Sequence, residues 1–275
     1  MKLVRLLQVI FFCTFFLSCQ KEFSDTTITA PIVFNVDASK FIDSLGITDN
    51  IQKSAINNLV TQLKDSSLWN KFLAIYPMIG GTSLSMSYNL VDPRNSDDAY
   101  RLTFKGNPVF NATGVLFPTT NDYGDTHLAD NVLPYNNNSI SYYSLTQNAV
   151  DGYDMGCVDY STPFNEFAIF NSTDASEWFG YYAWGKSPSN TKGLFLVSST
   201  TMDVKRYDNS VVTSSKGSAA DPLYTNSPIL IGTVAGASSG GQRECGFASI
   251  GYGLTDAQVV TFYNIVQNYE AALGR

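Results

Sequence analysis

The stretch GLFLVSSTTMDVKRYDNSVVTSS, residues 193–215, contains three short runs that each resemble a β-strand. The runs are residues 193–200, 202–207 and 210–215, and β-branched, aromatic and hydroxyl-bearing side chains suit strands. Asp208-Asn209 separates the last two runs, and both residue types favour turns because their side chains bond to nearby backbone groups. Short strands joined by tight turns predict an antiparallel arrangement.

Similar runs continue through most of the chain after Gly80. Charged residues make up only 15% of the sequence, whereas Tyr (16) and Phe (18) are abundant, and this composition favours strands over helices. Ten or more short strands separated by regular turns predict an antiparallel sandwich or barrel. The further runs are residues 83–90, 99–104, 139–145, 166–172, 178–184, 228–234 and 245–252.

A helix is expected near each end of this β-rich region. In residues 47–77, apolar side chains recur at intervals of four, and Thr48 or Asp49 can cap the helix that they form. Near the C-terminus, Thr255 and Gln258 form a T-x-x-Q capping box. The first apolar stripe is Ile51, Ala55, Leu59 and Leu63; the second is Val259, Phe262, Val266 and Leu273, with Gly274 at the expected stop.

The order of the final segments resembles the end of laminin-G-like, concanavalin A-like jelly-roll domains. The segments are VKRYDNSVVTSS (204–215), PILIGTVAG (228–236) and GFASIGYGLTDAQVVTFYNIV (246–266), and Ser210 replaces the glycine usual in the hairpin turn. Residues 51–275 also resemble a domain of phage tail or fibre proteins and bacterial surface proteins. The resemblance implies a mainly β protein, an antiparallel jelly-roll β-sandwich with an N-terminal and a C-terminal helix.

The first residues resemble a bacterial lipoprotein signal. Residues 1–18 combine Lys2 and Arg5 with an apolar run that is too short to span a membrane, and Leu17-Ser18-Cys19 resembles a lipobox. Cys19 is therefore predicted to be the lipidated first residue of the mature chain. Residues 19–38 are expected to be a flexible tether, and residues 39–275 a single sandwich domain that includes its flanking helices.

The charge of the chain bears on its partners and its location. The net charge is −7, and removal of residues 1–18 changes it to about −9. Phosphate binding relies on Lys/Arg clusters, so neither nucleic acid nor an anionic lipid surface is an expected partner, and the membrane is reached through the lipid anchor only. Gln20 follows the cysteine, which by resemblance to Gram-negative sorting indicates the outer membrane, and Lys21-Glu22 partly resembles a signal for export to the cell surface.

Cys157 and Cys245 are the cysteines that remain after Cys19. In an exported chain they could form one disulfide that closes a long loop. They could equally be two buried thiols, because cysteine packs well as a small apolar residue. The sequence leaves both alternatives open.

No enzyme is expected from the acidic residues. Glycosidases of this fold class use paired carboxylates, and the usual short spacing of Glu and Asp on one strand is absent. His127 is the only histidine, which makes a Cys/His zinc site improbable. A structural Ca²⁺ ion is the one cofactor with candidate ligands, Asp122 and Asp125, although turn chemistry explains these residues equally well.

The segment EWFGYYAWG, residues 177–185, is the most suggestive stretch for a ligand. As one strand it would place Trp178, Tyr182 and Trp184 on the same face, where aromatic rings stack on sugars. The alternative is a strand buried in the core on both faces. Arg101 is a further candidate ligand contact, with a solvated surface charge as its alternative.

The expected function is a lipid-anchored binding module that recognises carbohydrate at a surface or in the periplasm. The fold resemblance, the aromatic segment and the lack of a catalytic pair all favour it. A structural or adhesion module that binds protein without affinity for sugar is the alternative, and a glycoside hydrolase is less favoured.

Overall fold

The computed structural model describes residues 34–160, 165–171, 177–179, 183–185, 190–201, 203–217, 224–236 and 240–275. The chain divides into two units, Met1–Val33 and Phe34–Arg275, and all described residues belong to the second. The predicted signal, its lipobox and Cys19 lie outside the described residues. None of the helices in the described ranges has the length and apolar character needed to cross a membrane.

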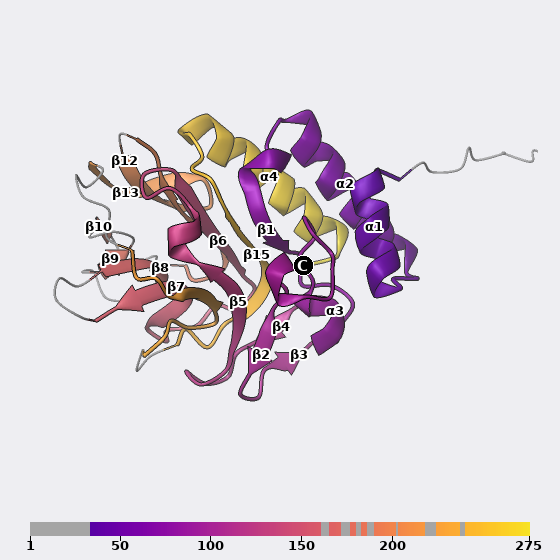
Figure 1. Cartoon of the computed structure of the whole chain (residues 1–275), viewed down its shortest axis with the longest axis horizontal. Helices are drawn as coiled ribbons and strands as arrows, with labels where there is room; N and C mark the ends of the chain where they lie inside the picture. The colour runs from indigo at the N-terminus through magenta and orange to yellow at the C-terminus, as the bar shows by residue number, and fades with distance from the viewer. Residues whose placement is uncertain are drawn as a thin grey trace, which may run out of the picture. The chain divides into compact units, whose positions relative to one another are not determined.

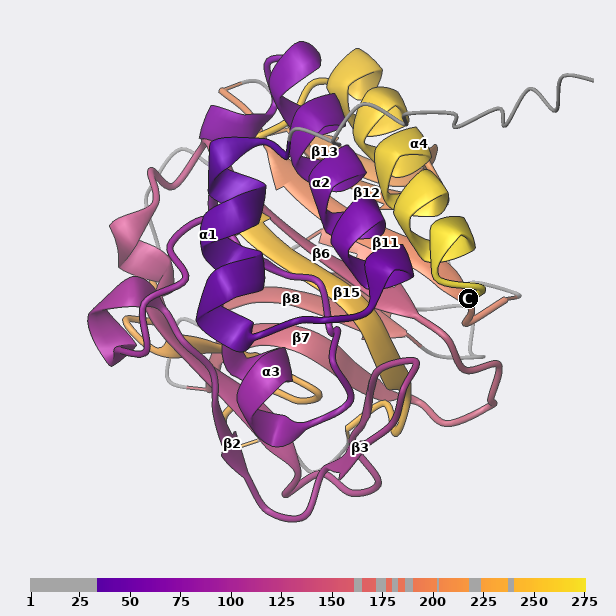
Figure 2. The same cartoon turned by 90° about the vertical axis from the view of Figure 1, so that its right-hand side faces the viewer.

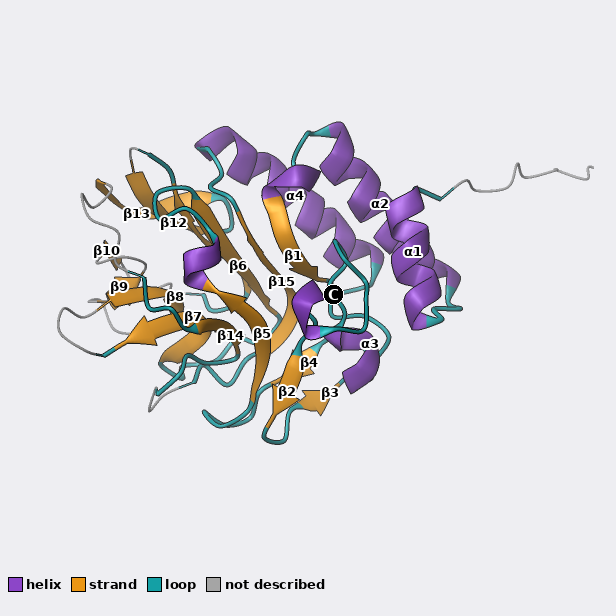
Figure 3. Cartoon of the chain, in the orientation of Figure 1, coloured by secondary structure: helices purple, strands orange, loops and turns teal. Residues whose placement is uncertain are grey.

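Two antiparallel sheets form a sandwich, as the sequence predicted (Figures 1 and 3). The larger, sheet A, has the strand order β13-β12-β11-β6-β15-β4-β3, and β1 also pairs with β15. Its strands are β1 (Phe72–Tyr76), β3 (Val109–Phe110), β4 (Val115–Leu116), β6 (Asn138–Ser144), β11 (Gly193–Ser199), β12 (Asp203–Asp208), β13 (Val211–Gly217) and β15 (Glu244–Gly251).

Sheet B is smaller and has the order β2-β5-β14-β7-β8. Its strands are β2 (Thr103–Lys105), β5 (Tyr123–Ala129), β7 (Gly152–Asp159), β8 (Asn165–Asn171) and β14 (Pro228–Ile231). A separate pair consists of β9 (Glu177–Phe179) and β10 (Ala183–Gly185). Residues 177–179 and 183–185 therefore form two short paired strands and not parts of the single strand that was expected.

The main core lies between the two sheets. Tyr142 and Phe195 from sheet A pack in one buried cluster with Phe167 and Ile169 from sheet B. The Tyr142 hydroxyl donates to the Arg243 carbonyl at 3.0 Å, so this buried polar atom is satisfied. Burial of large apolar side chains supplies most of the driving force for folding.

Helices cover the other face of sheet A (Figure 2). They are α1 (Val36–Leu45), α2 (Asn50–Asp65) and α4 (Asp256–Ala272). Phe262 of α4 packs against Phe72 and Phe247 of the sheet, with ring centroids 4.9 and 6.0 Å apart. The strands of sheet A beneath these helices, among them β1, β6, β11 and β15, are thus buried on both faces, and that area is not available as a ligand platform.

The helix ends show what local sequence can predict. Asp49 Oδ1 accepts from the Gln52 backbone N–H at 2.8 Å, and the capping box of Thr255 with Gln258 is present, as predicted. Gly274 has a φ of +73°, which suits the predicted stop of α4. Residues 36–38 lie in α1, although the sequence assigned them to the tether, because Asn35 caps the helix by accepting from the Asp37 N–H.

One predicted strand, residues 83–90, is wrong, and a second, residues 99–104, is wrong in part. Residues 83–90 begin with the helix α3 (Ser83–Ser87), because Thr82 and Ser85 form a reciprocal capping box. Residues 99–104 also differ: Tyr100 adopts a left-handed φ of +58° and ends a short 3₁₀ helix, so β2 starts only at Thr103. The alternating serines of residues 83–90 fit the pattern of a strand, but the capping box at Thr82 favours the helix α3 instead.

The hairpin between β12 and β13 matches the predicted turn. Asn209 and Ser210 have φ values of +50° and +68°, the pattern of a type I′ turn. Ser210 therefore takes the left-handed conformation that glycine adopts more readily. The Asn209 side-chain oxygen accepts from the Leu194 N–H at 2.9 Å and ties this turn to β11.

A buried chain of polar side chains joins the two sheets. Arg243, directly before β15, donates to Asp154 of β7 at 3.0 Å, and Asn171 of β8 donates to the same carboxylate at 2.6 Å. Arg206 of β12 donates to the Asn171 side-chain oxygen and pairs with Asp208 at 2.8 Å. Arg243, Asp154, Asn171 and Arg206 are each at most 1% exposed, so the two sheets share charges that water does not reach.

Of the two alternatives that the sequence left open for the cysteines, the structure shows two buried free thiols and no disulfide between them. Cys157 and Cys245 are both free, and they lie on β7 and β15, in different sheets. The Cys157 Sγ lies 3.9 Å from the carbonyl oxygen of Phe167, and the Cys245 Sγ lies 3.5 Å from that of Phe247. Each thiol thus bonds within its own sheet, and burial raises the pKa of both well above the ordinary value.

Replacing Arg243 by Met should destabilise the protein by about 3–5 kcal/mol, because Asp154 would then be buried without its ionic partner. Urea denaturation of wild type and R243M measures this difference. Arg94→Met is the matched control, since Arg94 pairs with Asp92 and Asp98 on the surface, where solvent screens the charges, and its replacement should change stability far less. Equal stabilities for R243M and R94M would contradict the structural role of the buried pair.

Candidate functional site

Two of the three aromatic candidates, Trp178 and Trp184, lie in the strand pair β9 and β10. Trp178 of β9 and Trp184 of β10 are register partners, so the two residues stand opposite each other across the pair. Tyr182 lies outside the described residues. The stacking platform that the sequence suggested for these three residues stays a prediction.

Arg101 lines a surface pocket of about 560 Å³, here called the Arg101 pocket. The pocket lies where α3 meets β2 and β3, at one edge of both sheets (Figure 1). It is lined by Ser83, Leu84 and Ser87 of α3, by Arg101 to Phe104, by Gly106 to Pro108 and by Phe110. Arg101 thus lies next to a concave surface, and its role as a ligand contact stays a prediction.

Two aromatic rings line this pocket. Phe104 of β2 and Phe110 of β3 are in edge-to-face contact, with centroids 4.9 Å apart and planes at 78°. Both side chains are half-buried against the core between the sheets. Leu84 lies on the same pocket and is 59% exposed, so part of the lining is apolar surface in contact with water.

The guanidinium of Arg101 is only partly engaged. Its Nη2 donates to Asp97 at 2.8 Å, and this ion pair lies at the surface, with 28% of the Arg101 side chain and 58% of the Asp97 side chain exposed. Among the described residues, neither Nε nor Nη1 has a hydrogen-bond partner, and Nε is enclosed by protein. Arg101 therefore keeps donor capacity beside the pocket.

Asp122 holds the turn that lines the pocket. Its carboxylate accepts from the Asn107 N–H at 2.6 Å, from the Thr119 N–H at 2.8 Å and from the Thr119 hydroxyl at 2.7 Å. Burial raises the pKa of Asp122, but these donors outweigh burial, and the net pKa is lowered. Gly106 lies against the same carboxylate, and a Cβ there would come within 2.3 Å of Asp122 Oδ1.

Asp122 and Asp125 bond to different groups and do not form a shared metal site in this structure. Asp125 accepts from the His127 N–H at 2.8 Å, whereas Asp122 serves the turn at Asn107. No group of three Asp, Glu, His or Cys side chains that could hold a metal ion occurs in the described ranges. Turn chemistry accounts for both carboxylates, and a calcium ion at them stays a prediction without further support.

His127 lies at the surface of sheet B, next to the Arg101 pocket. Its Nε2 is 2.8 Å from the hydroxyl of Thr103, which lines the pocket, and 3.6 Å from Asp97. Among the described contacts, the hydroxyl within hydrogen-bonding distance of its ring belongs to Thr103 and not to a serine. His127 acts here as a support for Thr103.

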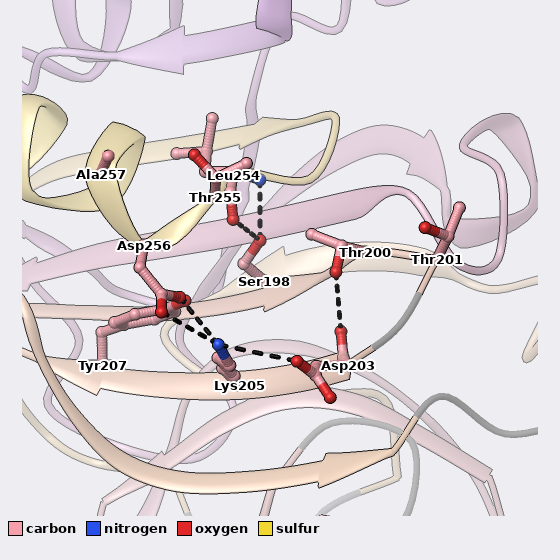
Figure 4. Close-up of a pocket in the computed structure, with 10 residues that line it drawn as sticks. All are labelled: Ser198, Thr200, Thr201, Asp203, Lys205, Tyr207, Leu254, Thr255, Asp256 and Ala257. Atoms are coloured by element: carbon pink, nitrogen blue, oxygen red, sulfur yellow. Dashed lines mark hydrogen bonds and ion pairs between the residues drawn. The ribbon is translucent and has the colours of Figure 1, made fainter.

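A second hollow, here called the polar pocket, lies between β11, β12 and the start of α4 (Figure 4). It has a volume of about 490 Å³, and its charged lining residues are Asp203, Lys205 and Asp256. Lys205 lies between the two carboxylates, 2.9 Å from Asp256 and 3.6 Å from Asp203. Tyr207 donates to Asp256 at 2.7 Å.

The groups in the polar pocket satisfy one another. Hydrogen bonds from Tyr207 and Lys205 lower the pKa of Asp256, and the bond to Asp256 raises the pKa of Lys205. Both residues therefore stay charged near neutral pH. Both carboxylates that line the polar pocket, Asp203 and Asp256, are ion-paired with Lys205.

Raised carboxyl pKa values do occur in the described part of the chain, but away from both pockets. Burial raises the pKa of Glu166 and of Glu270 to about 7. Glu166 is 2% exposed and Glu270 is fully buried, and neither lines the Arg101 pocket or the polar pocket. A general acid needs access to its substrate, so these two groups do not complete a glycosidase pair at either hollow.

The sequence predicted one residue of the Arg101 pocket and missed the others. Phe104 and Phe110 were not singled out, although the short segment Gly106-Asn107-Pro108 between them carries strong turn residues. Two aromatic residues on either side of a Gly-Asn-Pro turn are the local signal that could have indicated the site.

Comparisons with known proteins give distant similarities. No family model matches the chain, and no curated protein matches it. Domain 4 of AbnA, a GH43 extracellular arabinanase from Geobacillus stearothermophilus, in complex with arabinotriose, has 16% identity and a TM-score of 0.45, over 70% of this chain and 98% of that one. A mutant Trypanosoma rangeli sialidase with trans-sialidase activity has 8% identity and a TM-score of 0.49, over 78% of this chain and 39% of the sialidase.

The ligand-binding domain of botulinum neurotoxin serotype D, in complex with N-acetylneuraminic acid, has 11% identity and a TM-score of 0.41, over 72% of this chain and 52% of that one. These similarities are too distant to carry an argument about function, and the fold assignment rests on the two sheets themselves. The laminin-G-like resemblance likewise stays a prediction at the level of family.

Gly106→Ala should destabilise the protein by about 2 kcal/mol, because the residue has a φ of +74° and its Cβ would collide with Asp122 and the Asn121 backbone. Thermal or urea unfolding measures the change. Gly217→Ala is the control, since a Cβ there meets nothing within 4 Å, and its effect should stay within about 0.5 kcal/mol. A neutral G106A variant would show that Asp122 does not hold the turn as described.

Proposed function

We propose that this protein is a carbohydrate-binding module, and that the Arg101 pocket is its binding site. The observation that carries the proposal is the edge-to-face pair of Phe104 and Phe110 in a surface hollow that also offers the Arg101 guanidinium. Sugars present apolar C–H faces and hydroxyl edges, so aromatic rings beside hydrogen-bonding groups suit them. Thr103 and Asn107 supply such groups in the same hollow.

The dimensions of the pocket support a small ligand. Its volume of about 560 Å³ lies within the usual range of roughly 300–1,000 Å³ for ligand sites. Its walls come from α3, β2 and β3 and from the turn held by Asp122, so the hollow exists without a ligand. A preformed site loses less entropy when it binds.

A binding role is favoured over hydrolysis. Hydrolysis would need an acid and a second carboxylate that meet across the sugar. Arg101 is the ionisable residue that lines the Arg101 pocket, and the polar pocket holds carboxylates that are already paired with Lys205. The protein therefore holds a glycan in this proposal and leaves its bonds intact.

An adhesion module that binds protein is the second candidate. The edge strand β13 exposes Val211 at 64% and Val212 at 43%, and unpaired strand edges can add a strand from a partner. Retention of protein ligands by a variant with a disabled Arg101 pocket would favour this candidate.

The test is a glycan array probed with the purified protein and with the variant Phe110→Leu, which keeps apolar bulk but removes the ring. The wild type should retain at least one class of glycan, and F110L should weaken that binding about tenfold, because stacking contributes roughly 1 kcal/mol or more. Val211→Ala, on the remote strand β13, is the control and should bind as wild type. Absence of retained glycans, or equal binding by F110L, would remove the support for this site.

The module is also proposed to be exported and lipid-anchored to the outer membrane through Cys19, with residues 19–35 as its spacer. The lipobox-like Leu17-Ser18-Cys19 supports this part of the proposal. Radiolabelled fatty acid should enter the wild-type protein and not Cys19→Ala. Label that persists in C19A would mean that the lipobox interpretation is wrong.

A further inference from the structure

The two hollows differ in charge. Among the described residues that line the Arg101 pocket, Arg101 alone carries a formal charge, and its ion-pair partner Asp97 does not line the pocket. The polar pocket is lined by two carboxylates and one ammonium group and is net negative. A cationic group in a pocket lining is notable because the whole chain has a net charge of −7. An anionic ligand is therefore disfavoured at the polar pocket and favoured at the Arg101 pocket.

Arg101 is held in place by Asp97, but part of the hydrogen-bond donor capacity of its guanidinium remains unused. Its bond to Asp97 is a surface ion pair, and such pairs contribute little to stability because solvent screens them. Asp97 is also near His127 and Asp98, so the environment of this carboxylate does not depend on Arg101 alone. A ligand carboxylate could replace Asp97 on Nη2, or bind to the unpartnered Nη1, without breaking a buried contact.

We infer that the Arg101 pocket selects sugars that carry a carboxylate, such as uronic acid units of an acidic polysaccharide. The inference rests on the proposed function, because it names the glycan class that the same pocket takes. The planar guanidinium presents parallel N–H donors that match the two oxygens of a carboxylate. The sugar ring would lie against Phe104 and Phe110 while its carboxylate faces Arg101.

The experiment compares acidic glycans with neutral partners of the same linkage. Oligogalacturonates and glucuronate-bearing xylan fragments are measured by calorimetry at low ionic strength, each beside its carboxyl-reduced form. The acidic form should bind about tenfold more tightly, and the advantage should shrink as salt is added, because the Arg101 site is open to solvent. Sulfated oligosaccharides form a further arm and should bind less tightly than the carboxylates, since the planar fork fits a carboxylate.

Variants assign the preference to the guanidinium. Arg101→Gln should weaken binding of the acidic form about tenfold and binding of the neutral form clearly less, and R101K should fall between wild type and R101Q because it keeps charge without the fork. Asp97→Asn should strengthen binding of the acidic form, since it removes the competing carboxylate. Arg94→Gln is the matched control: this exposed arginine pairs with Asp92 and Asp98, does not line the pocket, and should behave as wild type.

The outcomes separate this inference from the proposed function. Equal binding of acidic and carboxyl-reduced forms, still lost in F110L, would overturn the carboxylate preference and leave glycan binding at this pocket intact. Equal losses for both forms in R101Q would also overturn it, because Arg101 would then be a general sugar contact. If neither form binds, nor any other glycan, the proposed function fails together with the inference.

Discussion

The bond between Arg243 and Asp154, extended through Asn171 to Arg206, is the contact on which the relative placement of the sheets depends. An apolar core is non-directional and tolerates small shifts of one sheet over the other. Buried charges do not tolerate such shifts, since loss of one partner leaves the other unpaired in a medium of low dielectric. The chain of polar groups links β12 and β15 of sheet A with β7 and β8 of sheet B. These bonds thereby fix the position of the two sheets relative to each other near the edge that contains β8 and β12.

The opposite edge, with β2 and β3, carries the Arg101 pocket and is stabilised differently. Asp122 stabilises this edge, because its carboxylate accepts hydrogen bonds from Asn107 and Thr119. These bonds fix the turn between the two short strands. The helices α1, α2 and α4 cover the part of sheet A that faces away from sheet B, which excludes that area as a binding surface. The proposed site lies instead at a rim of the sandwich, where short strands and turns place aromatic rings next to an arginine.

Local chemistry was predictable from the sequence, and long-range chemistry was not. The caps at Asp49 and Thr255 and the Asn209-Ser210 turn involve neighbours within a few residues, and all were confirmed. The alternating serines of residues 83–90 satisfied a strand pattern, but the capping box at Thr82 produced a helix. Arg243 and Asp154 are 89 residues apart, and Asp122 meets Asn107 across 15 residues, so no local pattern indicates either contact. The free thiols at Cys157 and Cys245 likewise follow from their placement in different sheets.

In the proposed function, Arg101 and the pair of Phe104 and Phe110 hold a carboxylate-bearing glycan in the Arg101 pocket. An NMR titration of isotopically labelled protein with an oligogalacturonate tests this directly, because it reports which residues meet the sugar. The account predicts shift changes at the Arg101 side-chain N–H groups and along residues 103–110, with the polar pocket around Lys205 unchanged. Shift changes centred on Lys205 and Asp256, or on the β9 and β10 pair, would contradict it.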